Sequence, residues 1–260
     1  MAAAERLDQI LDAVRVRRFL SVDDAVELTG SSPASIRRDF TRLAEQGALR
    51  RVRGGVRPTG TANMLPFEIR ESRQLPEKQA IARYAASLLR PGDVVIIDGG
   101  TTTFQLAVAL PPIPLRIITN SISLAHYLDQ HARRSAQIEI FLTGGYLYPN
   151  SGLLVGPGAR ATIAQYHVDW AFLSVAGITR DGFHNTNEMV VETEQQMLAS
   201  ADRSVVLADH SKVGRGAMCR ICPLGDVHQL ITDADPDSLE RLRQFADAGL
   251  RFETVPVLHD

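Results

Sequence analysis

Four short polar segments follow apolar stretches of the chain and have residue types suited to binding a small ligand. They are Asp98-Gly99-Gly100-Thr101-Thr102-Thr103, Thr119-Asn120-Ser121, Gly144-Gly145 and Asp209-His210-Ser211-Lys212. A glycine-rich turn followed by threonine hydroxyls at the start of a helix can hold a phosphate through backbone N–H groups and the helix dipole. The Gly-Lys-Ser/Thr element of a nucleotide-binding loop and the full dinucleotide-binding glycine signature are both missing. Taken alone, the first segment fits an ordinary strand-to-helix turn equally well.

The elements around these segments are expected to bring them together. Helical and apolar strand patterns alternate from residue 76 onward, which predicts a mostly parallel sheet covered by helices on both faces. The predicted strands are 94–97, 115–119, 138–142, 168–175, 204–208, 228–232 and 251–256. The predicted helices are 76–89, 101–110, one after 121, 157–166, 188–202 and 236–248. Ligands in such sheets bind beyond the carboxyl ends of the strands, where all four polar segments fall.

This convergence predicts a site for a small anionic effector and no bound metal or cofactor. The expected effector-binding residues are Asp98, Gly100, Thr101, Thr102, Thr103, Thr119, Asn120, Ser121, Gly144, Gly145, Asp209 and Lys212. Lys212 is one of only two lysines in the chain, although a surface position is the usual one for lysine. Catalysis on such a ligand by proton transfer needs a carboxylate that moves a proton and a nearby donor. Asp98, Asp209, Glu192, Glu194 and Lys212 could supply these groups, so catalysis stays an alternative.

A second group of residues, near the N-terminus, is suited to bind DNA. Helices are predicted over 4–18 and 22–28, with a third helix capped by Ser32 and ending at Gly47. On the third helix Ile36, Phe40 and Leu43 share one face, which leaves the serine and arginine side chains on the other faces. Arginine can hydrogen-bond guanine with two N–H groups in the major groove. An Arg-rich helix could also be merely solvated, so the helix alone does not decide.

The segment after the third helix favours DNA binding. Residues 48–57 read as a strand, a Gly-Gly turn and a second strand, and a basic hairpin after a recognition helix is the layout of a winged helix-turn-helix. The arginines of such a wing are expected near the flanking DNA backbone or the minor groove, where they mainly position the protein. The expected DNA-binding residues are Ser32, Ser35, Arg37, Arg38, Arg42, Arg51 and Arg53.

Charge is distributed as expected for a DNA-binding segment joined to a separate ligand-binding domain. The chain carries a net charge of −2, but residues 1–57 hold eleven arginines against eight acidic residues, a net of +3. The remainder holds 17 basic and 22 acidic residues, a net of −5. A basic module joined to an acidic domain is typical of a protein that binds a polyanion with one end.

Several of these motifs resemble the DeoR family of regulators. Ser35-Ile36-Arg37-Arg38-Asp39-Phe40 and Arg51-Val52-Arg53-Gly54-Gly55-Val56 are similar to its DNA-binding signature, commonly TIRRDL and RVHGGA. Ser35, Phe40, Arg53 and Val56 are mild departures from it, and Arg53 adds charge to the wing. The resemblance continues through Lys78 with Ile81-Ala82 and through the four polar segments, although Gly99 stands where a serine is frequent. It implies a domain similar in fold to ribose-5-phosphate isomerase that senses a phosphorylated sugar.

The expected organisation is a winged helix-turn-helix domain (1–57), a linker (58–75) rich in Pro and Gly at its start, and an α/β effector-sensing domain (76–260). No apolar run approaches the roughly 20 residues of a membrane helix. Cys219 and Cys222 lack a second ligand pair for zinc and are expected to be packing residues near a strand. Their scarcity and the absence of a secretion signal favour a cytoplasmic location.

The sequence therefore predicts a bacterial regulator of transcription and not an enzyme. The resemblance implies a repressor of a sugar or carbohydrate catabolic operon whose operator binding changes with a phosphorylated sugar. Its expected partners are double-stranded operator DNA, the phosphorylated sugar and other copies of itself, as a dimer or tetramer. Two alternatives stay open: a sugar-phosphate isomerase-like enzyme, and a constitutive DNA-binding protein whose larger domain only dimerises.

Overall fold

The computed structural model describes residues 3–59, 67–131, 137–149 and 151–257. The chain forms two compact units, Met1–Arg73 and Gln74–Asp260. The boundary between them falls inside the segment predicted to be a linker. Each unit is described by itself below.

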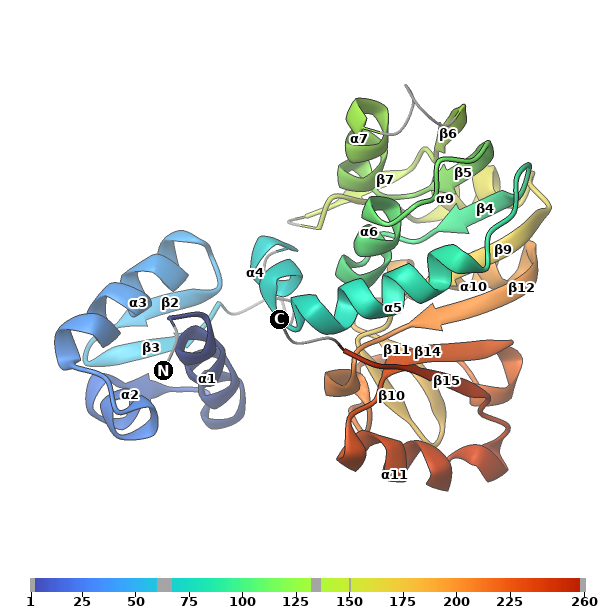
Figure 1. The fold of residues 1–260 in the computed structure, drawn as a ribbon. Helices are drawn as coiled ribbons and strands as arrows, with labels where there is room; N and C mark the ends of the chain where they lie inside the picture. Colours follow the sequence, from blue (N-terminus) through green and yellow to red (C-terminus); the bar gives the residue numbers. More distant parts are fainter. Residues whose placement is uncertain (1–2, 60–66, 132–136, 150, 258–260) are drawn as a thin grey trace. The chain divides into compact units, whose positions relative to one another are not determined.

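The described part of the N-terminal unit combines helices with a small antiparallel sheet (Figure 1). Its elements are α1 (Ala3–Arg17), β1 (Leu20–Ser21), α2 (Val22–Thr29), α3 (Pro33–Glu45), β2 (Leu49–Val52), β3 (Gly55–Pro58) and α4 (Phe67–Ser72). The sheet order is β1-β3-β2. Three helices followed by a β-hairpin confirm the predicted winged helix-turn-helix. The pattern did not reveal β1, because two residues are too few to show a strand period.

Local sequence signals account for the helix boundaries in this unit. The Ser21 hydroxyl accepts a hydrogen bond from the Asp24 N–H and the Asp24 carboxylate accepts one from the Ser21 N–H, which is the predicted capping box. Ile36, Phe40 and Leu43 are buried, as their spacing on α3 predicted. They pack with residues of α1, α2 and the sheet in one apolar core.

The wing turn differs from the predicted Gly-Gly turn. Val52 pairs with Gly55, so the two turn residues are Arg53 and Gly54, and Gly54 has a φ of +82°. Gly55 lies in β3 opposite Ser21, where a Cβ atom would come within 2.2 Å of the Leu20 carbonyl oxygen. Gly54 is therefore required by the turn, and Gly55 by the close approach of β1.

The C-terminal unit is built on a seven-stranded sheet. Its helices are α5 (Leu75–Ser87), α6 (Thr101–Val108), α7 (Ile122–His131), α9 (Pro157–Ile163), α10 (Glu188–Ala199) and α11 (Pro236–Gln244). Its main strands are β4 (Val94–Ile97), β5 (Leu115–Thr119), β6 (Ile138–Leu142), β9 (Val168–Leu173), β12 (Ala201–Leu207), β14 (Gln229–Asp233) and β15 (Phe252–Val255). Three short 3₁₀ helices are η1 (His210–Lys212), η2 (Leu224–Asp226) and η3 (Ala246–Ala248).

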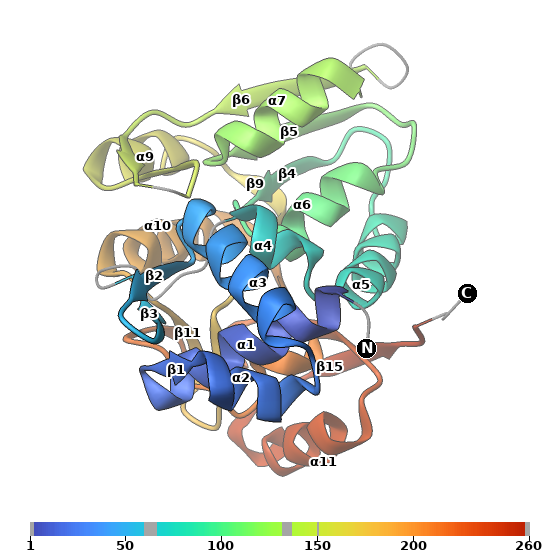
Figure 2. The same ribbon diagram turned by 90° about the vertical axis from the view of Figure 1, so that its left-hand side faces the viewer.

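The large sheet is parallel throughout, with the order β15-β14-β12-β9-β4-β5-β6. Side chains alternate between its faces: Val95 and Ile97 pack under α5, α6 and α7, whereas Ile96 packs under α9, α10 and α11. Figure 2 shows α5 and α6 on one side of the sheet and α9 and α10 on the other. The predicted parallel α/β domain is confirmed. The chain runs outward from β4 to β6 and returns on the other side at β9, which makes β4–β9 the switch point.

Two small antiparallel sheets were not predicted. β7 (Tyr146–Tyr148) pairs with β8 (Leu153–Val155), and β10 (Gly177–Thr179), β11 (Gly182–Asn185) and β13 (Cys219–Cys222) form the other. Both cysteines lie in β13 as free thiols, and burial raises the pKa of Cys222 to about 12. A thiol with that pKa stays neutral, which suits the packing role expected from the sequence.

The second half of the predicted linker belongs to the N-terminal unit. Ile69 of α4 is buried in the core of that unit, and Arg73 forms ion pairs with Asp8 (2.9 Å) and Asp12 (3.0 Å) of α1. Residues 60–66, which hold the early part of the segment, lie outside the described residues. Within the part of the chain that the structure describes, no helix is both long and apolar enough to cross a membrane.

Candidate DNA interface and effector site

The exposed face of α3 presents three arginines side by side. Ser32 caps the helix by accepting a hydrogen bond from the Ser35 N–H (3.2 Å), and Pro33 occupies the first turn. Arg37, Arg38 and Arg42 are exposed. A shallow hollow of about 290 Å³ lies on this face, lined by Arg37, Arg38, Thr41, Arg42, Glu45 and Arg51. The helix and the wing therefore share one cationic surface.

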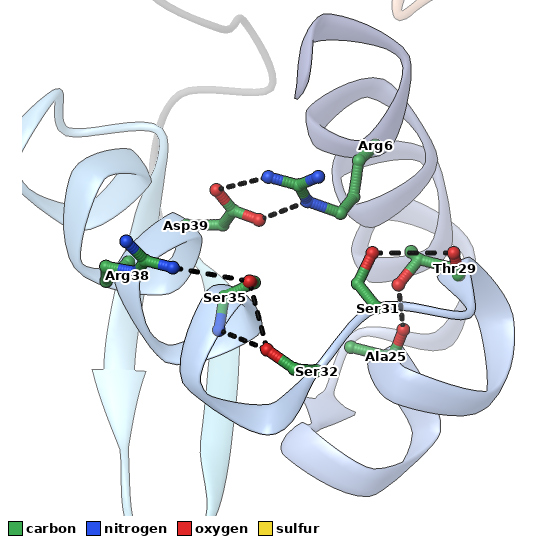
Figure 3. A network of polar contacts seen from close by, with 8 residues as sticks. All are labelled: Arg6, Ala25, Thr29, Ser31, Ser32, Ser35, Arg38 and Asp39. Atoms are coloured by element: carbon green, nitrogen blue, oxygen red, sulfur yellow. Dashed lines mark hydrogen bonds and ion pairs between the residues drawn. The ribbon is translucent and has the colours of Figure 1, made fainter. Parts of the chain in front are cut away.

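Hydrogen bonds hold two of these arginines, Arg38 and Arg51, and Figure 3 shows the contact of Arg38. Arg38 donates to the Ser35 hydroxyl (3.4 Å), and the Ser35 and Ser32 hydroxyls lie 3.0 Å apart. Arg51, from β2, donates to the Thr41 hydroxyl (3.0 Å), which in turn donates to the Arg37 carbonyl. Arg51 is thus held against α3, whereas Arg53 is exposed at the wing turn. Thr41 was missed from the sequence, because only the fold shows that it meets Arg51.

An ion pair fixes the other side of α3. Arg6 of α1 donates to the buried Asp39 carboxylate at 2.6 Å, and this hydrogen bond raises the pKa of Arg6. Figure 3 shows the pair linking the two helices. Since Asp39 is neutralised inside the unit, its charge does not offset the arginines on the exposed face.

The second candidate site lies along the carboxyl edge of the large sheet. Among the described residues of the C-terminal unit, six buried side-chain atoms have no hydrogen-bond partner: Asp98 Oδ1, Asn120 Nδ2, Thr143 Oγ1, Glu194 Oε2, Asp209 Oδ2 and Thr232 Oγ1. All but Glu194 lie at or just beyond the carboxyl end of a strand. Leaving such an atom unpaired costs about 1–3 kcal/mol, so each of them needs a polar partner, such as a buried water or a ligand.

Asp98 stands at the switch point. It follows β4, and its Oδ2 atom accepts hydrogen bonds from the Ser174 hydroxyl (2.9 Å) and N–H (3.3 Å), just beyond β9. Burial raises the pKa of Asp98, although the Ser174 hydrogen bonds favour the carboxylate. The Gly99 N–H and the Asn120 side chain also favour the carboxylate, while its Oδ1 atom has no hydrogen bond of normal geometry. Ser174 was not predicted, because the sequence gives no sign that it meets Asp98.

The two glycines after Asp98 allow side chains to fit closely. A Cβ atom at Gly99 would lie 2.0 Å from Leu153 Cδ2, so Leu153 fills the space that a side chain at position 99 would need. A Cβ atom at Gly100 would lie 2.0 Å from the Ser174 hydroxyl oxygen. Gly100 is therefore required for the Asp98–Ser174 contact. Gly145, with a φ of +126°, is required where β7 meets the Val155 carbonyl, and Gly144 precedes it in the open.

Several of the predicted threonines and serines use their hydroxyl groups in hydrogen bonds within the turns. The Thr103 hydroxyl accepts from the Gly100 N–H (2.7 Å) and donates to the Gly100 carbonyl, so it caps α6. Thr119 donates to the Ile97 carbonyl, and the Ser121 hydroxyl accepts from the Leu124 N–H. Asn120 accepts from the Gly99 N–H through Oδ1 (3.1 Å), which leaves its buried Nδ2 donor unpaired next to the start of α6. Thr101 and Thr102 are buried in the first turn of that helix.

A buried carboxyl on α10 faces the same region. Glu194 accepts a hydrogen bond from Asn185 Nδ2 at 2.6 Å, and its Oε2 atom is unpaired. Burial raises the pKa of Glu194 well above its usual range; the charge of Asp98 adds to the rise, and the Asn185 hydrogen bond opposes it. The shift favours the protonated acid, which can donate to a ligand as well as accept. From the sequence Glu194 was considered only as a possible catalytic group.

A cluster of buried and half-buried charged residues lies beyond β12. Asp209 is buried and accepts from the Ser211 N–H. Burial alone would raise the pKa of Asp209, but Lys212, Ser211, Lys78 and His210 together lower it. The structure thus adds Lys78, which is 2% exposed on α5, to the predicted Asp209 and Lys212. Nothing in the spacing of α5 distinguishes a buried lysine from a surface one.

His210 belongs to the same cluster. The ring Nδ1 atom of His210 lies 2.6 Å from Asp233 Oδ2, and the backbone N–H of His210 donates to Asp233 Oδ1 at 2.7 Å. The hydrogen bond to Asp233 raises the pKa of His210 to about 9, against the opposing effect of burial. His210 is therefore a cation at neutral pH. Among the described residues, no group of three or more His, Cys, Asp or Glu side chains could hold a metal ion.

Comparisons with known proteins identify a family for each of the two units. The model of the DeoR-like helix-turn-helix domain matches residues 6–60, and that of the DeoR C-terminal sensor domain matches residues 73–234. The chain is 33% identical to the uncharacterized HTH-type transcriptional regulator YulB of Bacillus subtilis over 261 residues, covering 99% of this chain and 98% of that protein.

Two further similarities complete the comparison. The chain is 32% identical to the HTH-type transcriptional regulator UlaR of Salmonella arizonae, over 93% of this chain and 96% of that protein. Ribose 5-phosphate isomerase A of Methanocaldococcus jannaschii is 18% identical with a TM-score of 0.36, covering 52% of this chain and 53% of that one. That score is too low to bear on function. The two family models and the full-length relatives show that the chain belongs to the DeoR family of helix-turn-helix transcriptional regulators.

Proposed function

We propose that this regulator is a repressor of a sugar or carbohydrate catabolic operon, and that a phosphorylated sugar bound at the carboxyl edge of the sheet controls its binding to the operator. The observation that carries the proposal is the row of unpaired buried polar atoms beside the start of α6 and the Lys78–Lys212 cluster. Hydroxyl groups and a phosphate are the ligand groups that such acceptors, donors and cations would satisfy.

In this proposal the residues divide into two kinds. Thr101, Thr102 and the Asn120 amide contact the effector, as do Asp98, Asp209 and the lysines. The hydroxyls of Thr103, Thr119 and Ser121 instead hold the turns in place, because their hydrogen bonds are made within the chain. Gly145 lets the segment after β6 pack against the Val155 carbonyl and Ala159, and Gly144 leaves open space beside it in which the effector would lie.

At the DNA the proposal assigns base reading to α3 and backbone contact to the wing. Ser35, Arg37, Arg38 and Arg42 enter the major groove, with Ser32 at the helix start near a phosphate, and Arg51 and Arg53 contact the flanking backbone. A homo-oligomer, dimer or tetramer, places two such helices in half-sites about 34–36 Å apart or a multiple of that distance.

Thermal unfolding with a panel of phosphorylated pentoses, hexoses and ketohexoses tests the effector site. A ligand present at 100 times its dissociation constant should stabilise the protein by about 2.7 kcal/mol. Thr102→Val removes one buried hydroxyl at the start of α6 and should weaken that ligand by about 10- to 150-fold, since a hydrogen bond to a charged group contributes about 1.5–3 kcal/mol. DNA binding without ligand should not change.

Thr162→Val is the matched control, because the Thr162 hydroxyl bonds only within α9, to the Gly158 carbonyl. It should leave the ligand-induced shift intact. If no sugar phosphate stabilises the wild-type protein, the domain is not a sensor of this class and the dimerisation alternative gains support. Aldose–ketose exchange seen by NMR with any member of the panel would instead establish an enzyme.

A further inference from the structure

Arg6 and Asp39, neither of which is expected to contact DNA, meet where α1 packs on α3. We propose that Arg6 is a positioning residue for DNA binding: it holds the Asp39 carboxylate against α1 and keeps a negative charge away from the arginines that face DNA. The inference rests on the proposed assignment of α3 as the helix that enters the major groove. It adds a residue of α1 that controls DNA affinity without touching DNA.

Asp39 lies on the border between the buried and the exposed faces of α3. At about 100° per residue, its side chain projects about 40° from that of Leu43 on one side and about 60° from that of Arg42 on the other. Leu43 is in the core, whereas Arg42 is exposed. A carboxylate at this position can therefore turn either toward α1 or toward the exposed arginines.

Arg6 determines the direction in which the carboxylate turns. The Arg6 Nε atom donates to Asp39 Oδ2 at 2.6 Å, and the Nη2 atom donates to Oδ1 at 3.4 Å. Both carboxylate oxygens therefore face α1, as Figure 3 shows. The two side chains are only 17% and 11% exposed, so little water reaches the pair. A two-pronged arginine–carboxylate pair fixes the geometry of both groups as well as balancing their charges.

Without Arg6, the Asp39 carboxylate has a cationic neighbour on its own helix. Residues three apart on a helix lie side by side, so Asp39 can pair with Arg42, one of the arginines proposed to enter the major groove. A buried carboxylate without a partner is unfavourable, which drives this rearrangement. The new pair would occupy the Arg42 guanidinium and place a negative charge near the DNA phosphates, and like charges across an interface weaken binding.

The same ion pair also joins two helices, and a purely structural role predicts a different result. Arg6→Gln and Asp39→Asn both break the pair, but only Arg6→Gln leaves a carboxylate on α3. If the negative charge is what matters, the two variants differ in DNA affinity, and removing the carboxylate corrects the loss of Arg6. If the pair only joins α1 to α3, the two variants behave alike.

Binding of the full-length protein to an operator duplex, selected by the protein from random DNA, distinguishes the two roles. Arg6→Gln should weaken binding about fivefold or more and lower the slope of log affinity against log salt by about one, because Asp39 then competes with phosphate for Arg42. Asp39→Asn alone should bind within about twofold of the wild type, because an amide carries no charge to repel phosphate. Arg6→Gln combined with Asp39→Asn should also return to within about twofold of the wild type and recover the salt slope.

Arg73→Gln is the matched control. It breaks the ion pairs of Arg73 with Asp8 (2.9 Å) and Asp12 (3.0 Å) of α1 but leaves no unpaired carboxylate on α3. Its operator affinity should stay close to that of the wild type. Arg6→Lys, which keeps the positive charge, should lose less affinity than Arg6→Gln. Thermal unfolding without DNA shows whether each variant is folded.

Restored binding in the double variant supports the inference. If Asp39→Asn and the double variant bind as weakly as Arg6→Gln, the pair only joins the helices, and the inference is wrong. It is also wrong if Arg6→Gln binds like the wild type or if Arg73→Gln weakens binding equally. If Arg6→Gln does not fold, Asp39→Asn decides alone, since weakened binding by that folded variant contradicts the inference and unchanged binding supports it. The assignment of α3 to the major groove is tested separately, by Arg38→Ala.

Discussion

Replacing Arg38 with alanine is expected to weaken binding to the preferred operator by about 5- to 150-fold, or about 1–3 kcal/mol, while binding to unrelated DNA changes little. The side chain is exposed on α3 and donates a hydrogen bond to the Ser35 hydroxyl. Loss of a two-pronged contact to a base removes discrimination, because non-specific binding depends on phosphate contacts. Competition binding with a selected operator and a scrambled duplex measures the effect.

Arg51→Ala is the matched control for this prediction. Arg51 is equally exposed but is held by Thr41 on the wing side, where it is positioned to contact phosphate. Its loss should weaken all DNA about equally and reduce the slope of log affinity against log salt by about one. If Arg38→Ala lowers the salt slope and Arg51→Ala relaxes specificity, the assignment of base and backbone contacts is reversed.

The protein should lose stability between pH 6.5 and 9 because of His210. Its pKa rises from 6.5 to about 9 on folding, chiefly through the hydrogen bond to Asp233. The folded state binds the proton more tightly, so the stabilisation is fully present below pH 6.5 and is lost as the pH rises through 9. At 1.36 kcal/mol per pKa unit the contribution is at most about 3 kcal/mol. Urea unfolding at pH 6, 7.5 and 9 measures it.

His210→Gln should be less stable at pH 6 and should lack most of this pH dependence. His167→Gln is the control, because His167 is 79% exposed beside Asp202 and should contribute little to the slope. An unchanged slope in the His210 variant would assign the pH dependence to other groups and would remove the His210–Asp233 pair from the account.

Short sequence patterns predicted the elements that are determined by interactions between residues close in the sequence. The face of α3 with Ile36 and Phe40 followed from helical periodicity, and the capping box at Ser21 followed from a three-residue spacing. The parallel sheet followed from alternating apolar strands and helices. The two-residue β1 and the short strands β7 and β10 have no such period, so they could not be recognised.

The candidate effector site was predicted at the level of strand ends but not of individual contacts. Lys78 lies on a helix that precedes the first strand of the sheet, and only the packing of α5 brings it near Asp209. Ser174 contacts Asp98, which lies 76 residues before it in the sequence. Asn185 contacts Glu194, which lies 9 residues after it. Conversely, the run of three threonines suggested three hydroxyl groups that contact the ligand, whereas the hydroxyl of Thr103 caps α6.

We propose that the binding of a small anionic ligand at the sheet edge and the binding of DNA at α3 are coupled through one chain. The most direct test measures the affinity of the tightest-binding sugar phosphate with and without a saturating operator duplex, selected by the protein from random DNA. Linkage requires the operator to weaken the ligand by the same factor by which the ligand weakens the operator, and allosteric couplings typically give about 5- to 150-fold. We predict a factor in that range. Equal ligand affinity in the presence and absence of the operator would contradict the account.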